Sequence, residues 1–150
     1  MHSYWTTQTS INILFELCEE NAETVFKKQQ NYTQRYNYLI VLMFDILIAL
    51  RELEKLNIIH RDIKPENILI KEGFFKLADL GLSRILEKGN NCLTNDIGNR
   101  LGRSPEFGTG KYSVKTDIWS LGVNIFYLLE STLPFDEESL LKIKNNPNDI

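Results

Sequence analysis

Several reactive side chains of this chain are gathered in one short stretch, residues 60–67. It reads His-Arg-Asp-Ile-Lys-Pro-Glu-Asn, so Asp62 stands two positions before Lys64 and five before Asn67. A carboxylate can accept a proton, an ammonium group can face an anion, and an amide oxygen can bind a hard cation. Such mixed chemistry at fixed spacing rarely arises by chance, although a polar turn before an ordinary strand would use the same residue types.

A second acidic position, Asp79, follows a predicted β-hairpin. Residues 68–70 form a short apolar run, Lys-Glu-Gly interrupts it, and residues 74–78 form a second run. Two such runs joined by a short turn with glycine are typical of antiparallel strands. Because a hairpin returns the chain to its starting point, we expect Asp79 to lie beside Asn67, where two oxygen ligands could meet on a hard cation. Taken alone, Asp-Leu-Gly is a common turn tripeptide.

Longer apolar patterns predict the helices that hold these loops in place. Residues 38–56, interrupted by Asp45, read as a buried helix. Residues 112–130 repeat apolar side chains at three- and four-residue steps and carry others between them, which predicts a helix buried on nearly all sides. Asp117 would then be a buried carboxylate that needs hydrogen-bond donors. The alternative is that it only favours the N-terminus of the helix electrostatically.

Composition and charge narrow the class of protein. The chain has 150 residues, of which 43% are hydrophobic and 25% charged, as in one globular domain with a real core. A net charge of −3 argues against a nucleic-acid-binding surface.

The sequence also bears on where the protein is located. The apolar run of residues 38–50 is too short for a membrane span, and the N-terminus lacks the basic region of a signal peptide. Cys18 and Cys92 show neither metal-ligand spacing nor a disulfide framework, so we expect an intracellular location, cytoplasmic or nuclear.

Four motifs together resemble those of eukaryotic protein kinases. Residues 60–67 match the catalytic loop His-Arg-Asp-x-x-x-x-Asn, and residues 79–81 resemble the magnesium motif Asp-Phe-Gly with Leu in place of Phe. Residues 104–106, Ser-Pro-Glu, resemble the Ala-Pro-Glu that closes the activation segment. Residues 117–122 carry the Asp-x-Trp-Ser-x-Gly pattern of the central helix in the large lobe. By this resemblance, the donors to Asp117 are backbone N–H groups of the catalytic loop, around His60 and Arg61.

The resemblance implies an α+β, protein-kinase-like fold whose mainly α-helical large lobe carries a small catalytic hairpin, with the small lobe essentially absent. Residues 1–18 would be the last small-lobe strand, at residues 11–17, and the hinge. Residues 19–150 would be the large lobe, truncated at its C-terminus, with a further helix at residues 137–144. No glycine precedes Gly73, so no glycine-rich loop is expected in this chain. No Val-Ala-Ile-Lys-like strand precedes the hinge, so the phosphate-binding lysine is not expected either.

Carried over residue by residue, the resemblance implies a catalytic set of Asp62, Lys64 and Asn67. Asp62 would orient the substrate hydroxyl and accept its proton. Lys64 would stabilise the charge of the γ-phosphoryl group. Asn67 and Asp79 would hold the magnesium ions that bridge the phosphates of ATP.

The nucleotide base would meet the hinge. By the same resemblance, Phe15 would be the gatekeeper, and the carbonyl of Glu16 and the amide of Cys18 would face the adenine. ATP and Mg²⁺ are therefore the expected cofactors. A phosphate on Thr94 of the activation segment could pair with Arg61, although Thr94 would equally suit an ordinary loop.

The function implied is that of a protein serine/threonine kinase that transfers the γ-phosphate of ATP to a protein hydroxyl. A lysine at position 64 of this loop is more typical of serine/threonine kinases than of tyrosine kinases. A kinase of small metabolites is a poorer match, because a segment that ends in Ser-Pro-Glu resembles protein kinases specifically. The expected partner is a protein substrate, with no nucleic acid and no membrane, and the sequence does not indicate the oligomeric state. The alternative is a catalytically silent kinase lobe that acts as a binding or regulatory module.

Overall fold

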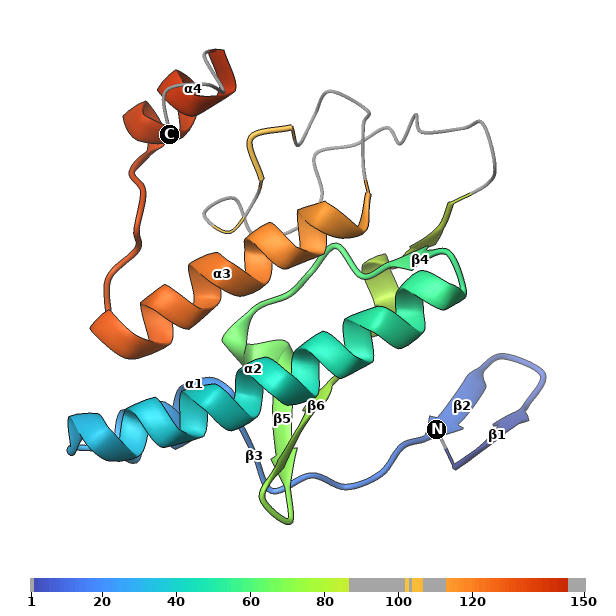
Figure 1. Ribbon diagram of the computed structural model, residues 1–150. Helices are drawn as coiled ribbons and strands as arrows, with labels where there is room; N and C mark the ends of the chain where they lie inside the picture. Colours follow the sequence, from blue (N-terminus) through green and yellow to red (C-terminus); the bar gives the residue numbers. More distant parts are fainter. Residues whose placement is uncertain (1, 87–101, 103, 107–112, 146–150) are drawn as a thin grey trace.

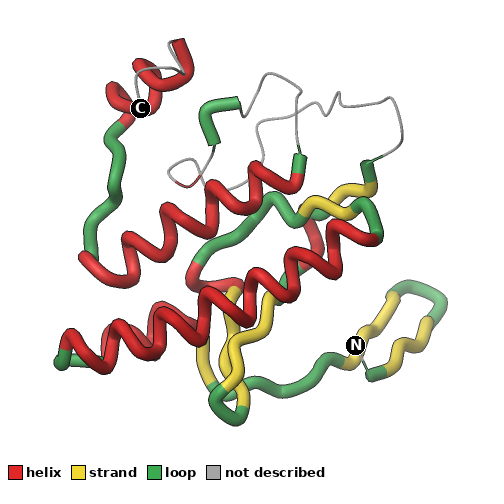
Figure 2. Tube along the Cα trace, viewed as in Figure 1, coloured by secondary structure: helices red, strands yellow, loops and turns green. Residues whose placement is uncertain are grey.

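The computed structural model describes residues 2–86, 102, 104–106 and 113–145, and its fold is mixed α and β, as predicted. Figures 1 and 2 show long helices beside small sheets. The helices are α1 (Ala22–Lys28), α2 (Tyr32–Lys55), α3 (Val114–Glu130) and α4 (Glu137–Asn145). The strands are β1 (Ser3–Thr6), β2 (Ile11–Leu14), β3 (Glu20–Asn21), β4 (Ile58–Ile59), β5 (Ile68–Lys71), β6 (Phe74–Leu77) and β7 (Arg84–Ile85). Short 3₁₀ helices span Pro65–Asn67 and Leu80–Leu82.

Helix α2 is the longest element, and it lies beside α3 (Figure 1). The Asn31 side chain caps its N-terminus by accepting from the backbone N–H of Thr33 at 2.8 Å. Its buried side chains recur at helical spacing on one face: Leu39, Leu42, Ile46 and Leu50. Arg35 ties the two helices together by donating to the carbonyl of Leu128, near the C-terminus of α3, at 2.8 Å.

The prediction that residues 38–56 form a helix is confirmed, but the prediction that this helix is buried is wrong for its outer face. Val41, Phe44 and Ile48 are exposed. Within the part of the chain that the structure describes, α3 and the β5–β6 hairpin pack against α2 and bury its other face. Helix α3 shows the same departure on a smaller scale, since Ile118 and Phe126 are exposed.

Strands β5 and β6 form the predicted hairpin, and β3 pairs with the outer edge of β5. Glu72 and Gly73 at its turn have φ angles of 53° and 82°. Positive φ at both central residues is what a two-residue hairpin turn of type I′ requires, and glycine adopts it without steric cost. The hairpin is held to α2 because the Asp45 carboxylate accepts from the backbone N–H of Phe75 at 2.7 Å. The ring of Phe75 packs against Phe26 and Tyr38 in the core.

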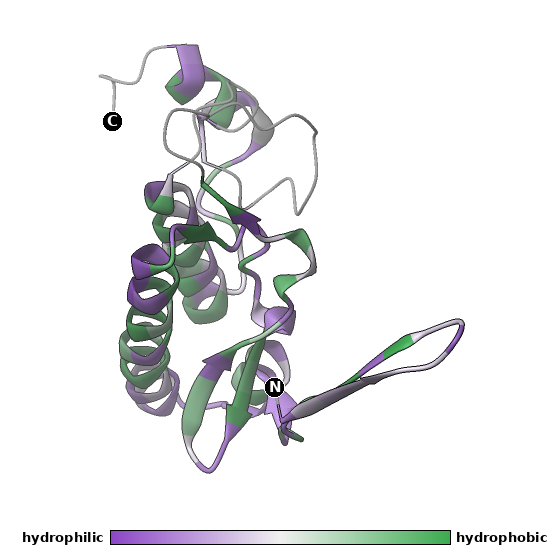
Figure 3. Cartoon of the chain, turned by 90° about the vertical axis from the view of Figure 1, so that its right-hand side faces the viewer, coloured by the Kyte–Doolittle hydropathy of each residue, from purple (hydrophilic) through white to green (hydrophobic). Residues whose placement is uncertain are grey.

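At the N-terminus the structure has two strands where the sequence predicted one over residues 11–17. Strand β2 ends at Leu14, and β1 pairs with it antiparallel. The turn between them is closed by Thr7, whose backbone N–H donates to the Ser10 carbonyl at 2.8 Å and whose hydroxyl accepts from the Ser10 N–H at 3.0 Å. Hydroxyl side chains close such turns without glycine or proline, so the usual turn signal was missing. Figure 3 shows this hairpin projecting from the body of the protein.

Among the described helices, none is long and apolar enough to cross a membrane.

We expect Ile46→Ala to lower the free energy of unfolding by about 2–5 kcal/mol, because Ile46 is fully buried and its truncation leaves a cavity. The matched control is Ile48→Ala on the same helix, where 51% of the residue is exposed and the change should be within about 0.5 kcal/mol. Denaturant unfolding of both variants measures the difference. Equal losses would contradict the assignment of the buried face.

Candidate active site

The loop of residues 60–67 runs from β4 to β5 and is anchored by His60, whose side chain is fully buried. The imidazole Nδ1 accepts from the backbone N–H of Asp62 at 3.3 Å, and Nε2 lies 3.0 Å from the carbonyl of Ala78. A single tautomer with its proton on Nε2 satisfies both contacts. His60 therefore links the loop to the end of β6, one residue before Asp79.

Helix α3 holds the same loop through a buried carboxylate. Asp117 accepts from the backbone N–H of His60 at 2.8 Å and from that of Arg61 at 2.9 Å, so the donors expected from the family resemblance are confirmed. Burial raises the pKa of Asp117, while the two N–H groups oppose the rise by stabilising the charged form. Two turns along α3, Asn124 donates to the carbonyl of Ile63 at 2.9 Å.

Asn124 was missed by the sequence reasoning. A polar residue that shares the Asp117 face of an otherwise apolar helix was the signal that could have found it.

Within the loop, three predicted site residues lie in direct contact. Lys64 Nζ is 2.8 Å from Asp62 Oδ2, and Asn67 Nδ2 donates to the same oxygen at 2.8 Å and to the Asp62 carbonyl at 3.0 Å. The hydrogen bond from Lys64 to Asp62 raises the pKa of the lysine, so it stays charged at neutral pH. Asp62 is buried, and these two donors hold its carboxylate in one orientation.

Asp79 lies at the far end of the β5–β6 hairpin, which returns it toward Asn67. The backbone N–H of Ala78 donates to the Asn67 carbonyl at 2.8 Å, and Ile68 pairs with Leu77. Asp79 has φ 64°, in the left-handed region that non-glycine residues seldom adopt. Its Oδ1 accepts from the backbone N–H of Gly81 at 3.0 Å, and a Cβ at Gly81 would lie 2.9 Å from that oxygen. A side chain at position 81 would therefore force the Asp79 carboxylate to shift from this position.

Two residues at this site, Arg61 and Asp79, have an unusual backbone conformation. Arg61, like Asp79, has a positive φ, of 68°. Its Nε donates to the carbonyl of Leu82 at 2.7 Å, which joins the loop to the short helix after Asp79. Strained conformations of this kind persist where the surrounding contacts fix them, and they cluster at functional sites.

The predicted base-binding residues Glu16 and Cys18 lie in the linker (residues 15–19) between β2 and β3. Cys18 is partly buried with a free thiol. The Glu16 carboxylate contacts Lys71 at 3.0 Å and Lys76 at 2.6 Å, both on the β5–β6 hairpin. The sequence reasoning assigned only backbone groups of the linker, and it missed these two ion pairs.

The expected magnesium ligands form a small donor set. Among the residues described, no three His, Cys, Asp or Glu side chains gather in a way that could hold a metal ion. Asn67 and Asp79 supply one amide and one carboxylate. That set fits magnesium, which usually takes one or two carboxylate ligands from the protein and completes its shell with water and phosphate oxygens.

The protein kinase domain model matches residues 1–149 of the chain. The chain belongs to the protein kinase family. As a family, protein kinases use ATP and magnesium.

Three curated relatives illustrate the match. The chain is 36% identical over 138 residues to calcium-dependent protein kinase 6 of Plasmodium berghei, covering 89% of this chain and 9% of the relative. It is 32% identical over 143 residues to serine/threonine-protein kinase PEPKR2 of Arabidopsis thaliana, covering 93% and 30%. It is 36% identical over 145 residues to cyclin-dependent kinase 7 of Caenorhabditis elegans, covering 92% and 44%. The chain thus spans less than half the length of each of these relatives.

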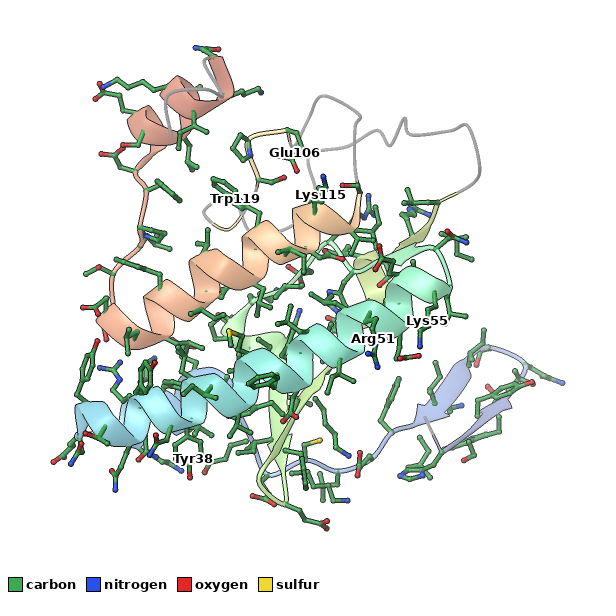
Figure 4. The ribbon with its side chains drawn as sticks, viewed as in Figure 1. Tyr38, Arg51, Lys55, Glu106, Lys115 and Trp119 are labelled. Atoms are coloured by element: carbon green, nitrogen blue, oxygen red, sulfur yellow. The ribbon has the colours of Figure 1, made fainter. Side chains whose placement is uncertain are left out.

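The kinase motif Ser-Pro-Glu lies against the N-terminal half of α3. Glu106 accepts from the Thr116 hydroxyl at 3.3 Å, and Ser120 donates to the Gly102 carbonyl at 2.8 Å. Figure 4 shows Glu106 on the side of α3 that carries Lys115 and Trp119. Thr94, the proposed phosphorylation site, lies outside the described residues.

We expect Asp117→Asn to lower the free energy of unfolding by about 1–3 kcal/mol, since one amide oxygen cannot replace two carboxylate oxygens and a buried N–H loses its acceptor. The control is Asp136→Asn, because Asp136 is exposed and accepts one backbone N–H, from Ser139, which asparagine can also do. Thermal or denaturant unfolding compares them. A loss for Asp117→Asn no larger than for the control would show that its hydrogen bonds to the loop are dispensable.

Proposed function

We propose that this chain is part of a protein serine/threonine kinase that transfers the γ-phosphate of ATP to a hydroxyl group of a protein substrate. The observation that carries the proposal is the hydrogen-bonded set of Asp62, Lys64 and Asn67 at one end of the hairpin that ends in Asp79. Residues 1–18 would belong to the small lobe and hinge of that kinase, and residues 19–150 to its large lobe.

Asp62 is our candidate for the residue that orients the substrate hydroxyl and accepts its proton. Both side-chain donors, Lys64 and Asn67, bind Oδ2, so Oδ1 is the oxygen that we expect to face the hydroxyl. A base must sit within hydrogen-bonding reach of the proton that it removes, and a fixed carboxylate lowers the entropic cost of reaching that geometry.

Lys64 would supply positive charge beside the phosphoryl group. Its ammonium group is charged and already next to Asp62, where the acceptor hydroxyl would lie. A fixed cation at the point where negative charge shifts during transfer stabilises the transition state more than the ground state.

Asn67 and Asp79 would hold magnesium. The amide nitrogen of Asn67 is used by Asp62, which leaves its oxygen for a cation, and Asp79 has one carboxylate oxygen bound to Gly81 and a second to offer. When bound, magnesium would neutralise part of the negative charge of the phosphates. The carbonyl of Glu16 and the amide of Cys18 would face the adenine.

Serine and threonine are the proposed acceptors because Lys64 stands two residues after Asp62, and because relatives such as PEPKR2 are named serine/threonine-protein kinases. The free Cys18 thiol fits a reducing compartment, so we propose an intracellular location, cytoplasmic or nuclear.

A second candidate function is that of a binding module without phosphotransfer. It is favoured by apolar side chains that the described structure leaves exposed on the β1–β2 hairpin, among them Trp5 and Ile11. Exposed apolar patches often mark interaction surfaces. The two candidates differ in whether Asp62 matters for activity.

We expect Asp62→Asn to lower kcat for phosphotransfer by about 10²–10⁴-fold in the full-length protein, because the amide cannot accept the proton. ATP affinity should stay the same, since Asp62 does not contact the nucleotide in this proposal. Transfer of labelled phosphate to a generic protein substrate measures the rate, and Asp136→Asn is the control for the same chemical change. An unchanged rate would contradict the assignment, and a wild-type protein without transfer would favour the binding module.

We expect Asp79→Asn to raise the magnesium concentration needed for half-maximal activity by at least about tenfold, because even the loss of an outer partner of a metal site commonly costs that much. A magnesium titration of the full-length protein measures it, with Mg²⁺–ATP binding as the second readout. An unaltered titration would remove Asp79 from the ligand set.

A further inference from the structure

The linker (residues 15–19) is attached to the β5–β6 hairpin by one side chain with two cationic partners. Glu16 Oε1 lies 3.0 Å from Lys71 Nζ, and Oε2 lies 2.6 Å from Lys76 Nζ. The two lysines come from opposite strands of the hairpin, β5 and β6. One carboxylate therefore spans both strands.

Beyond Glu16, the linker meets the same hairpin through Glu19. Its backbone N–H donates to the Ile70 carbonyl at 3.0 Å, and its carboxylate accepts from the backbone N–H of Glu72 at 2.9 Å. Strand β3 then pairs with β5, with Glu20 opposite Ile70. The C-terminal end of the linker is thus fixed by bonds to backbone groups of the hairpin, whereas Glu16 is attached through contacts between side chains only.

The position of this attachment matters because the β1–β2 hairpin has little else to hold it. In the described part of the chain, β1 and β2 form a sheet of two strands, and residues such as Ile11 and Leu14 are exposed. Figures 1 and 3 show the hairpin standing away from the helices, joined to them by the linker. The Glu16 contacts are therefore where the linker is first fixed to the body.

The charges of this cluster are stable across the neutral range. Hydrogen bonds from Lys76 and then Lys71 lower the pKa of Glu16 to about 2. A lowered carboxylate pKa means that the attraction is fully present above the usual value near 4.5 and is lost as the pH falls through about 2. The three side chains are partly exposed, so salt should weaken the cluster.

We propose that Glu16 is a positioning residue whose carboxylate clamps the linker to the β5–β6 hairpin through Lys71 and Lys76. The clamp fixes the linker backbone relative to Asp79, which ends the same hairpin. The consequence for nucleotide binding rests on the proposed function, in which the Glu16 carbonyl and the Cys18 amide face the adenine while Asp79 holds magnesium. The linker would then bind the base and the end of the hairpin would bind the phosphates. The cluster of Glu16, Lys71 and Lys76 would fix the position of these two parts relative to each other.

An isolated ion pair at a protein surface often contributes little, and that is the competing explanation. Two features argue against it here. The carboxylate uses both oxygens, so breaking one contact leaves the other in place. Both lysines also stand on a hairpin that is anchored to α2 through Asp45, so their backbone is already ordered.

The first test measures amide hydrogen exchange in the nucleotide-free full-length protein. In Glu16→Gln, exchange at the Glu19 and Glu72 amides should be about two- to tenfold faster than in the wild type, the range expected when a surface ion-pair network is lost. The matched control is Glu52→Gln, because Glu52 is an exposed carboxylate that also contacts two cations, Arg51 and Lys55, near the C-terminal end of α2 (Figure 4). Unchanged exchange in Glu16→Gln would overturn the clamp.

The second test separates KM for ATP from kcat. Glu16→Gln should raise KM by about two- to tenfold with kcat nearly unchanged, because the clamp acts on nucleotide binding and not on the transfer step. The double variant Lys71→Met/Lys76→Met should show the same rise, and adding Glu16→Gln to it should add nothing, since all three residues act as one cluster.

Additive effects, or a KM equal to that of the wild type, would overturn the positioning role. A wild-type protein that binds no ATP would contradict the proposed function instead, and the exchange measurement would then decide the clamp by itself.

Discussion

The site depends on one buried carboxylate. Asp117 lies inside the protein, where an unpaired charge would be costly, and it is stabilised there by the backbone N–H groups of His60 and Arg61. The same hydrogen bonds also stabilise the loop, because its two backbone N–H groups would otherwise have no acceptor. Helix α3 is held in place by core packing and by its contact with α2, so it gives the loop a rigid support. Asn124 extends that support to the carbonyl of Ile63.

From this point, hydrogen bonds continue to the second half of the site. Asp117 holds the backbone of His60, and the His60 ring contacts the carbonyl of Ala78, the residue before Asp79. The backbone N–H of Ala78 in turn donates to Asn67. The 60–67 loop and the end of the β5–β6 hairpin are therefore bound to each other by several contacts. In the proposed kinase mechanism, this arrangement would keep the proton acceptor and the magnesium ligands at a constant separation before any substrate arrives, which is how preorganised sites reduce the barrier.

Much of the architecture follows from local patterns. The hairpin, the long helix before it, the helix that begins near Asp117 and the short helix after residue 136 all have the periodicity or turn residues of their class. The errors have two separate causes. Residues such as Phe44 and Ile48 are apolar on a face that the described structure leaves exposed, and periodicity cannot tell which apolar face finds a partner. Strand β1 went unpredicted because Thr7 and Ser10 close its turn with hydroxyl groups.

For the candidate site too, some features could be read from the sequence and others only from the folded structure. The identities and spacing of Asp62, Lys64 and Asn67 are readable from the chain because they are neighbours in one loop, where a family pattern applies directly. The contacts that set their geometry join residues far apart in sequence: 57 positions separate His60 from Asp117, and 60 separate Glu16 from Lys76. Apolar periodicity indicates which positions share one face of an element, but a carboxylate acquires its partner only when packing brings another element to it. The Asp117 donors could be expected only through the family resemblance, whereas the Glu16 ion pairs and the Asn124 contact became visible only in the folded structure.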